Sequence, residues 1–180
     1  MKRLYAASER SKAVDLIELP ASAAWWFLPF VLPICFYVAF TDLRMMRITN
    51  QAVLALTAVF VSVGLIALPL GEYGSGLLRL VIVLVAGIVL NAIGVLGAGD
   101  AKFMAAAAPF VVGEDVYLVV ALLAAALLAA FITHRFAKWT PLRRIAPEWE
   151  SWSVGKKFPM GFALGGTLAF YLMLATQFGT

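Results

Sequence analysis

Long uncharged stretches of apolar residues alternate along the chain with short polar segments. Five such stretches contain no Asp, Glu, Lys or Arg, at residues 23–41, 51–71, 80–99, 116–133 and 158–180. Each is close to the ~20 residues that a helix needs to cross the hydrocarbon core of a bilayer. The stretches are solidly apolar, whereas the strands of a transmembrane barrel alternate apolar and polar positions. The pattern therefore predicts membrane-spanning helices.

A sixth apolar piece, residues 103–113, is too short to span a bilayer on its own. It reaches a spanning length only if it extends through the polar residues on either side, so we expect a short fourth helix that is partly polar at its start. The predicted fold is an all-α integral membrane protein, a bundle of about six transmembrane helices. Residues 1–22 would form an N-terminal tail, and residues 23–180 one membrane domain.

The N-terminal tail does not have the pattern of a cleavable signal peptide. Its first twenty residues hold four basic and three acidic residues and no apolar core. The first apolar stretch also lacks a small-residue cleavage site at its end, so we expect the first span to be retained. A ragged apolar face within residues 4–19 leaves open that the tail lies on the membrane surface as an interfacial helix.

Composition supports a membrane protein and excludes several kinds of site. Hydrophobic residues make up 63% of the 180 residues and charged residues only 13%, compared with ~25% charged residues in soluble domains. The single cysteine, Cys35, allows no disulfide within the chain and no CxxC zinc or redox site. No glycine motif of the phosphate-binding kind is present. We therefore expect no metal, no cofactor and no nucleic-acid partner.

Basic residues are concentrated in the segments that six spans would place on one side of the membrane. The connections after the first and third spans and the loop 134–157 together carry nine Lys and Arg residues. On the other side, Arg79 is the only basic residue near the loops. The N-terminal tail would also lie on that side, and its four basic residues are an exception to this uneven distribution. Because short cytoplasmic loops are enriched in Lys and Arg, we expect the side with nine basic residues to face the cytoplasm.

The loop 134–157 is the only long connection between predicted spans. Its tryptophans stand among basic residues, a combination typical of segments that contact lipid headgroups. A role in guiding a substrate is the alternative. Pro141 and Pro147 argue against one continuous helix across this loop.

Two carboxylates lie at the ends of predicted spans. Asp42 ends the first span and Asp100 follows the third, so both are expected at the same side of the membrane, where acids near hydrocarbon are functional candidates. Two carboxylates that meet in one site share a proton and titrate as a pair. Such a pair suits peptide hydrolysis, because one carboxylate activates water while the other donates a proton. From the residues alone, each Asp could also simply mark the membrane interface.

Polar and small residues near the two acids have candidate roles of their own. Gly97 and Gly99 directly precede Asp100, and we expect them to adopt torsions that other residues avoid, to break the third span and to let a substrate backbone come close. Asp100 could also cap the short fourth helix. We expect Asn50 to cap the second span, with a position facing the site as the alternative.

Three segments of the sequence resemble the prepilin peptidases, a branch of the GxGD aspartyl membrane proteases. The segment GAGDAK at residues 97–102 is similar to their Gly-x-Gly-Asp-x-Lys signature. Asp42 and the basic residues after it resemble the partner motif, which usually ends in Ile-Pro-Asn, although Thr49 stands here in place of the proline. The segment KFPMGFA at residues 157–163 is similar to the family's Pro-x-Gly-x-Ala segment.

The resemblance implies a specific activity and a specific set of residues. The chain would be a membrane-embedded aspartyl endopeptidase that removes the short basic leader of type IV prepilins at the cytoplasmic membrane face. Asp42 and Asp100 would be catalytic. The residues implied to bind substrate or support the site are Gly97, Gly99, Lys102, Asn50, Pro159 and Gly161.

The resemblance also implies which form of the enzyme this is. Larger members of the family carry an extra cytoplasmic domain with CxxC zinc motifs, which is linked to N-methylation of the cleaved product. This chain has one cysteine and is similar to the small, peptidase-only form associated with Flp-type tight-adherence pili, or to archaeal preflagellin peptidases. We therefore expect no methyltransferase activity, and a place in a prokaryotic cytoplasmic membrane.

Two other classes of function stay open. A proton-coupled carrier or channel could use Asp42 and Asp100 as proton relays, although carriers often show two related halves and none is visible here. A scaffold protein of a secretion machine would need no chemistry at all. The paired acids and the GxGD segment favour the peptidase.

Overall fold

The structure is a computed structural model that describes residues 16–153 and 158–180. Six α-helices fill most of this part of the chain: α2 (Ala21–Met45), α3 (Asn50–Ala67), α4 (Leu70–Ala92), α5 (Ala98–Ala107), α6 (Val116–Trp139) and α7 (Met160–Phe178). Short 3-10 helices follow α5 and α6, namely η1 (Ala108–Phe110), η2 (Pro141–Ile145) and η3 (Glu150–Trp152). The all-helical bundle predicted from the sequence is confirmed for the described residues.

Five of the six α-helices are long and apolar enough to cross a membrane, and α5 is the exception. The apolar stretches of the sequence each fall within or largely within one of these helices, and the short fourth helix is α5 with η1 as its continuation. The long connection after α6 breaks into separate 3-10 helices, as its prolines predict. The chain is thus a multi-pass membrane protein.

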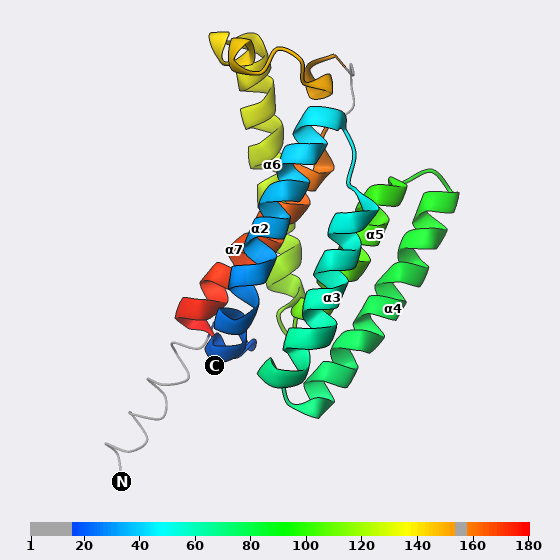
Figure 1. Cartoon of the computed structure of the whole chain (residues 1–180), viewed down its shortest axis with the longest axis vertical. Helices are drawn as coiled ribbons and strands as arrows, with labels where there is room; N and C mark the ends of the chain where they lie inside the picture. The colour runs from blue at the N-terminus through cyan, green and yellow to red at the C-terminus, as the bar shows by residue number, and fades with distance from the viewer. Residues whose placement is uncertain (1–15, 154–157) are drawn as a thin grey trace.

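Successive helices run in opposite directions along the bundle (Figure 1). The connections α2–α3 (46–49) and α4–α5 (93–97) and the described part of the connection α6–α7 (140–153 and 158–159) therefore lie at one end, which is the upper end in Figure 1. The connections α3–α4 and α5–α6 lie at the opposite, lower end. This arrangement brings the end of α2, the start of α5 and the start of α7 to the same end of the molecule.

The centre of the bundle is the contact between α2 and α7. Glycines on α7 permit this close packing: a Cβ on Gly165 would lie 2.9 Å from the carbonyl oxygen of Cys35 on α2. Small residues at such contacts let two helix backbones approach closely in a membrane, where the hydrophobic effect does not drive association. A larger residue at position 165 would therefore push α7 away from α2.

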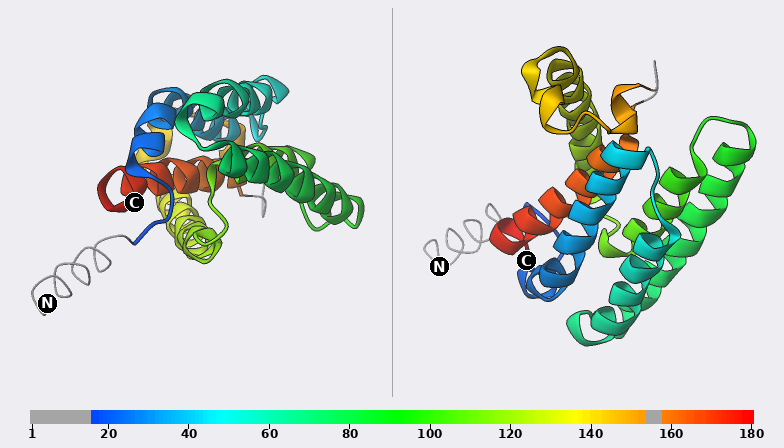
Figure 2. Two further views of the ribbon diagram at one scale, coloured as in Figure 1. Left: turned by 90° about the horizontal axis from the view of Figure 1, so that it is seen from below. Right: turned by 45° about the horizontal axis from the view of Figure 1, so that its top comes forward.

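Aromatic side chains fill the space between α2, α3 and η1. The rings of Phe27 and Phe110 meet edge to face at 4.9 Å, and Phe60 stacks on Tyr73 at 5.5 Å. Such pairs add stability beyond the area that they bury. On the other side, α6 packs on α7 and stands apart from α3 and α4 when the bundle is seen end-on (Figure 2).

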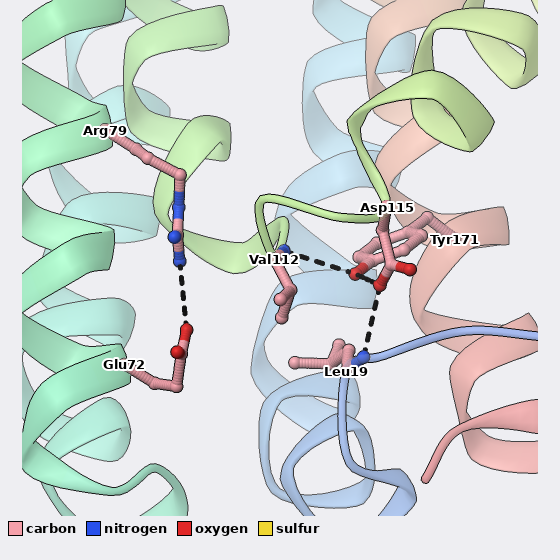
Figure 3. A network of polar contacts seen from close by, with 6 residues as sticks. All are labelled: Leu19, Glu72, Arg79, Val112, Asp115 and Tyr171. Carbon is pink, nitrogen blue, oxygen red and sulfur yellow. Dashed lines mark hydrogen bonds and ion pairs between the residues drawn. The ribbon is translucent and has the colours of Figure 1, made fainter. Parts of the chain in front are cut away.

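A buried carboxylate, Asp115, ties the lower end of the bundle together (Figure 3). Asp115 accepts hydrogen bonds from the backbone N–H groups of Glu18 at 2.9 Å and Leu19 at 3.1 Å. The hydroxyl of Tyr171 donates to the same carboxylate at 2.7 Å. Because a buried charge is costly without such partners, this network fixes the chain before α2 against the start of α6 and the lower part of α7.

The predicted N-terminal tail falls mostly outside the described residues, because the description begins at residue 16. The last residues of the tail pack inside the lower end, where the side chains of Ile17 and Leu19 are buried. The backbone N–H of Leu16 donates to the carbonyl of Phe178 at 3.1 Å, so this segment lies beside the end of α7.

Candidate active site

Both predicted catalytic carboxylates line one cavity at the upper end of the bundle. The cavity has a volume of about 560 Å³, within the range of ~300–1,000 Å³ that is usual for ligand pockets. Its walls come from the end of α2, the connection to α3, the start of α5 and the segment that leads into α7. The lining residues are Asp42, Met46, Arg47, Ile48, Asn50, Gly97, Ala98, Gly99, Asp100, Lys102, Phe158 and Met160.

Asp42 lies in the last turn of α2, where its side chain is only 5% exposed. Its Oδ2 accepts a hydrogen bond of 2.6 Å from the backbone N–H of Gly161, in the first turn of α7. The N–H groups at a helix start lack partners within the helix, and the helix dipole favours negative charge there. The start of α7 thus holds the Asp42 carboxylate in a fixed position.

Gly161 leaves room for this hydrogen bond. A Cβ at position 161 would lie 3.0 Å from the Cβ, Cγ and Oδ2 of Asp42, closer than side chains normally pack. Pro159 takes the N-cap position of α7 and does not line the cavity itself. The structure therefore brings the Pro159–Gly161 segment directly to Asp42, although 119 positions separate Gly161 from it in the sequence.

Asp100 is the third residue of α5, which places it in the first turn of this short helix. The alternative role of Asp100 as the cap of α5 is not found in the structure. Gly97 takes the N-cap position with an extended backbone and no side-chain cap, so Asp100 lies too far along the helix to serve as the cap. Asp100 is outside the five candidate spans, and burial raises the pKa of its carboxyl above the usual range.

The break before α5 differs from the expected one. Gly94, with a φ of +78°, is the only glycine in the left-handed region in the described part of the chain, and the helix α4 has already ended there. Gly97 and Gly99 do not need unusual torsions, so that expectation is wrong. They are small for another reason: a Cβ on Gly97 would lie 2.5 Å from Oδ2 of Asp100, and one on Gly99 would lie 3.3 Å from the Cβ of Ile48.

A hydrogen bond joins α5 to α3 at the edge of the cavity. The Nζ of Lys102 donates to Oδ1 of Asn50 at 3.1 Å. The expectation that Asn50 caps α3 is wrong, because Thr49 takes the N-cap position and its hydroxyl accepts from the backbone N–H of Ala52 at 3.3 Å. Asn50 instead lies in the cavity wall, which was the alternative. The threonine that replaces the usual proline thus supplies a cap of its own.

Several cavity residues were not singled out from the sequence. Met46, Arg47 and Ile48 lie between the two motif residues Asp42 and Asn50, and their position within the motif was the available signal. Met46 ends α2 with a φ of 50°, a left-handed cap that turns the chain back toward the cavity.

Phe158 and Met160 line the cavity from the segment that leads into α7. Phe158 is also held from outside the cavity, because its ring lies 6.0 Å from the rings of both Phe131 and His134 on α6. The aromatic contacts therefore fix this wall of the cavity to α6.

The arrangement can perform general acid–base chemistry on a substrate that enters the cavity. Two carboxylates from different helices face one space, and a backbone N–H orients one of them. Paired carboxylates can hold one proton between them, so that one acts as a base and the other as an acid. Within the described residues, no cluster of three or more His, Cys, Asp or Glu side chains has the arrangement of a metal site.

The model of the type IV leader peptidase family matches residues 29–134, which is more than half of the sequence and includes both cavity carboxylates. No curated protein sequence and no solved structure matches the chain.

Proposed function

The chain belongs to the type IV leader peptidase family, and we propose that it is an aspartic endopeptidase with Asp42 and Asp100 as its catalytic pair. The observation that carries this proposal is the single cavity lined by both carboxylates. We further propose that its substrate is a type IV prepilin of the Flp-like class and that it removes the short basic leader in front of the hydrophobic segment.

The proposed reaction uses the two carboxylates as one acid–base unit. The ionised member removes a proton from a water molecule, which attacks the carbonyl carbon of the scissile peptide bond. The protonated member donates its proton to the carbonyl oxygen, so that the resulting tetrahedral intermediate carries less charge. Collapse of the intermediate breaks the C–N bond, and the amine of the hydrophobic segment leaves with a proton returned from the carboxylate pair.

Other residues of the cavity would position the pair and the substrate. The N–H of Gly161 orients Asp42, and the bond from Lys102 to Asn50 sets α5, and with it Asp100, against α3. Because Gly97 and Gly99 have no side chains, they leave room for a peptide backbone to come close to Asp100. These are positioning roles, because the residues act through the carboxylates or through the bound substrate.

We propose that the cavity faces the cytoplasm. The upper end of the bundle carries Arg44, Arg47 and Lys102, and Arg143 and Arg144 of η2 lie at this end as well. Positive charge in short connections favours the cytoplasmic side. Labelling of a cysteine introduced at Thr140 in a Cys35→Ser background tests this: an impermeant reagent added outside intact cells should leave it unmodified, and efficient labelling would contradict the proposal.

Purified protein in detergent, incubated with an Flp-like prepilin, tests the proposed activity. We expect mass spectrometry to find one cut directly before the hydrophobic segment. The new N-terminus should stay unmethylated even when a methyl donor is added, because the single cysteine of this sequence can form no CxxC zinc motif. An intact prepilin, together with proton flux across liposomes that depends on Asp42 and Asp100, would contradict the peptidase and support a carrier.

A further inference from the structure

A second, almost wholly apolar groove lies between α4 and α5 on one side and α6 and α7 on the other. Its volume is about 330 Å³. Apolar side chains from all four helices line it, among them Ile82, Phe103, Met104, Val120, Leu164 and Leu168. The proposed peptidase reaction does not use any of these residues, so the groove needs an explanation of its own.

The groove begins one helical turn below the cavity that holds the carboxylates. Phe103 follows Asp100 by three residues on α5, and Leu164 follows Met160 by four residues on α7. Residues three or four apart on a helix lie on the same face in successive turns. An extended molecule could therefore occupy the cavity with one end and the groove with the other.

The groove opens sideways toward the surface that lipid would cover. α6 packs on α7, and the end-on view shows it apart from α4 (Figure 2). On the two edges of this opening, the side chains of Ile82 and Val120 are 57% and 59% exposed. A helix that already lies in the membrane can reach such a groove by lateral diffusion, without passing through water.

The lower part of the groove contains a cation, Arg79, whose polar groups are only partly satisfied. Its guanidinium lies 3.9 Å from the carboxylate of Glu72 (Figure 3), and its buried Nε has no hydrogen-bond partner among the described residues. Charge at membrane depth is costly and usually marks a binding or transport path. An occupant that brings a hydrogen-bond acceptor to this level would complete the site.

The depth of Arg79 can be related to the carboxylates. A Cβ on Gly87 of α4 would lie 3.0 Å from the Cβ of Ala101, the residue after Asp100, so these positions are level with each other. Arg79 precedes Gly87 by eight residues, which corresponds to about 12 Å along the helix at ~1.5 Å per residue. A helix whose first residue lies at the carboxylates would reach Arg79 after about eight residues.

We propose that this groove binds the first turns of the hydrophobic helix that follows the leader in the prepilin. The proposal rests on the proposed peptidase function. A helix in the groove would present the peptide bond at its N-terminal end to Asp42 and Asp100, which explains why cleavage falls before the hydrophobic segment. A hydrogen-bond acceptor about eight residues into that helix, at the depth derived above, would lie beside Arg79.

A tryptophan at the edge of the groove tests the proposal with two substrates. Val120→Trp should lower kcat/KM for full-length prepilin about tenfold, which corresponds to a loss of ~1.4 kcal/mol. Cleavage of a short peptide that ends a few residues after the scissile bond should stay unchanged. Leu128→Trp is the matched control, because Leu128 lies on the same helix, is 62% exposed and does not line the groove. Equal losses with both substrates, or with both variants, would overturn the proposal.

Photocrosslinking gives a second readout that does not require turnover. A benzoylphenylalanine at Ile82, in an Asp100→Asn background that keeps the prepilin intact, should crosslink to the hydrophobic helix. The same probe at Val81, which is 53% exposed but outside the groove, should not. Crosslinks between two copies of the chain, crosslinks to lipid only, or equal yields from both positions would contradict the proposal. If wild type cleaves neither substrate, the proposed function fails, whereas the crosslinks still test the groove.

Discussion

Replacement of either cavity carboxylate by its amide should lower kcat/KM for prepilin cleavage by at least about a thousandfold, as for other catalytic groups that act as a unit. An asparagine at either position has the shape of Asp but can neither take a proton from water nor donate one. The variants Asp42→Asn and Asp100→Asn therefore remove the chemistry while they keep the packing. Quantitative mass spectrometry of the cleaved product measures the effect.

A control variant separates loss of chemistry from loss of charge at this end of the bundle. Glu148→Gln removes an exposed carboxylate in the connection after α6, outside the cavity, and should leave cleavage unchanged. The two amide variants should unfold at nearly the same temperature as wild type, because in Asp42→Asn the Gly161 N–H can still donate to the side-chain amide oxygen. Wild-type cleavage rates in either amide variant would show that the carboxylate pair does not perform the reaction.

The variant Gly161→Val should lower kcat/KM about a hundredfold, the usual cost of misplacing a reacting group by about 1 Å. A Cβ at this position would lie 3.0 Å from three atoms of the Asp42 side chain. The two additional methyl groups of valine leave no room for the present contact, so α7 must move away from α2. That movement lengthens or breaks the 2.6 Å hydrogen bond that orients Asp42.

The same substitution five residues further along α7 is the matched control. A Cβ on Gly166 would meet nothing within 4 Å, so Gly166→Val changes helix propensity equally and leaves Asp42 untouched. Its kcat/KM should stay close to that of wild type. Equal losses of kcat/KM in the two variants would mean that valine destabilises α7 wherever it is placed. The proposed positioning role of Gly161 would then be wrong.

The sequence was sufficient to predict the helices and the end of the bundle at which the acids lie. Uncharged stretches of bilayer length follow directly from the cost of burying charge in hydrocarbon. Counting spans then put Asp42 and Asp100 on the same side. Whether they face one cavity depends on how α2, α5 and α7 pack, which is decided by contacts such as Gly161 with Asp42 across 119 positions.

The ends of the helices were predicted less well than their existence. The uncharged stretch 80–99 marks the apolar part of the third span, whereas α4 runs from Leu70 to Ala92. The difference arises because hydropathy indicates which residues lie in the bilayer and not where a helix begins and ends. A helix can begin in a polar segment and end within an apolar segment, as α4 does. The positive φ of Gly94 and the side-chain hydrogen bond by which Thr49 caps α3 are local features that hydropathy does not encode.

The pH dependence of kcat/KM for wild-type cleavage of prepilin tests the central claim most directly, because it reports the ionisation of the free enzyme. If Asp42 and Asp100 act as one unit, activity requires a single proton on the pair. The profile should then be bell-shaped, with two apparent pKa values that belong to the pair rather than to either residue. A profile with only one limb across the acidic range, in which a single carboxyl titrates, would contradict the account.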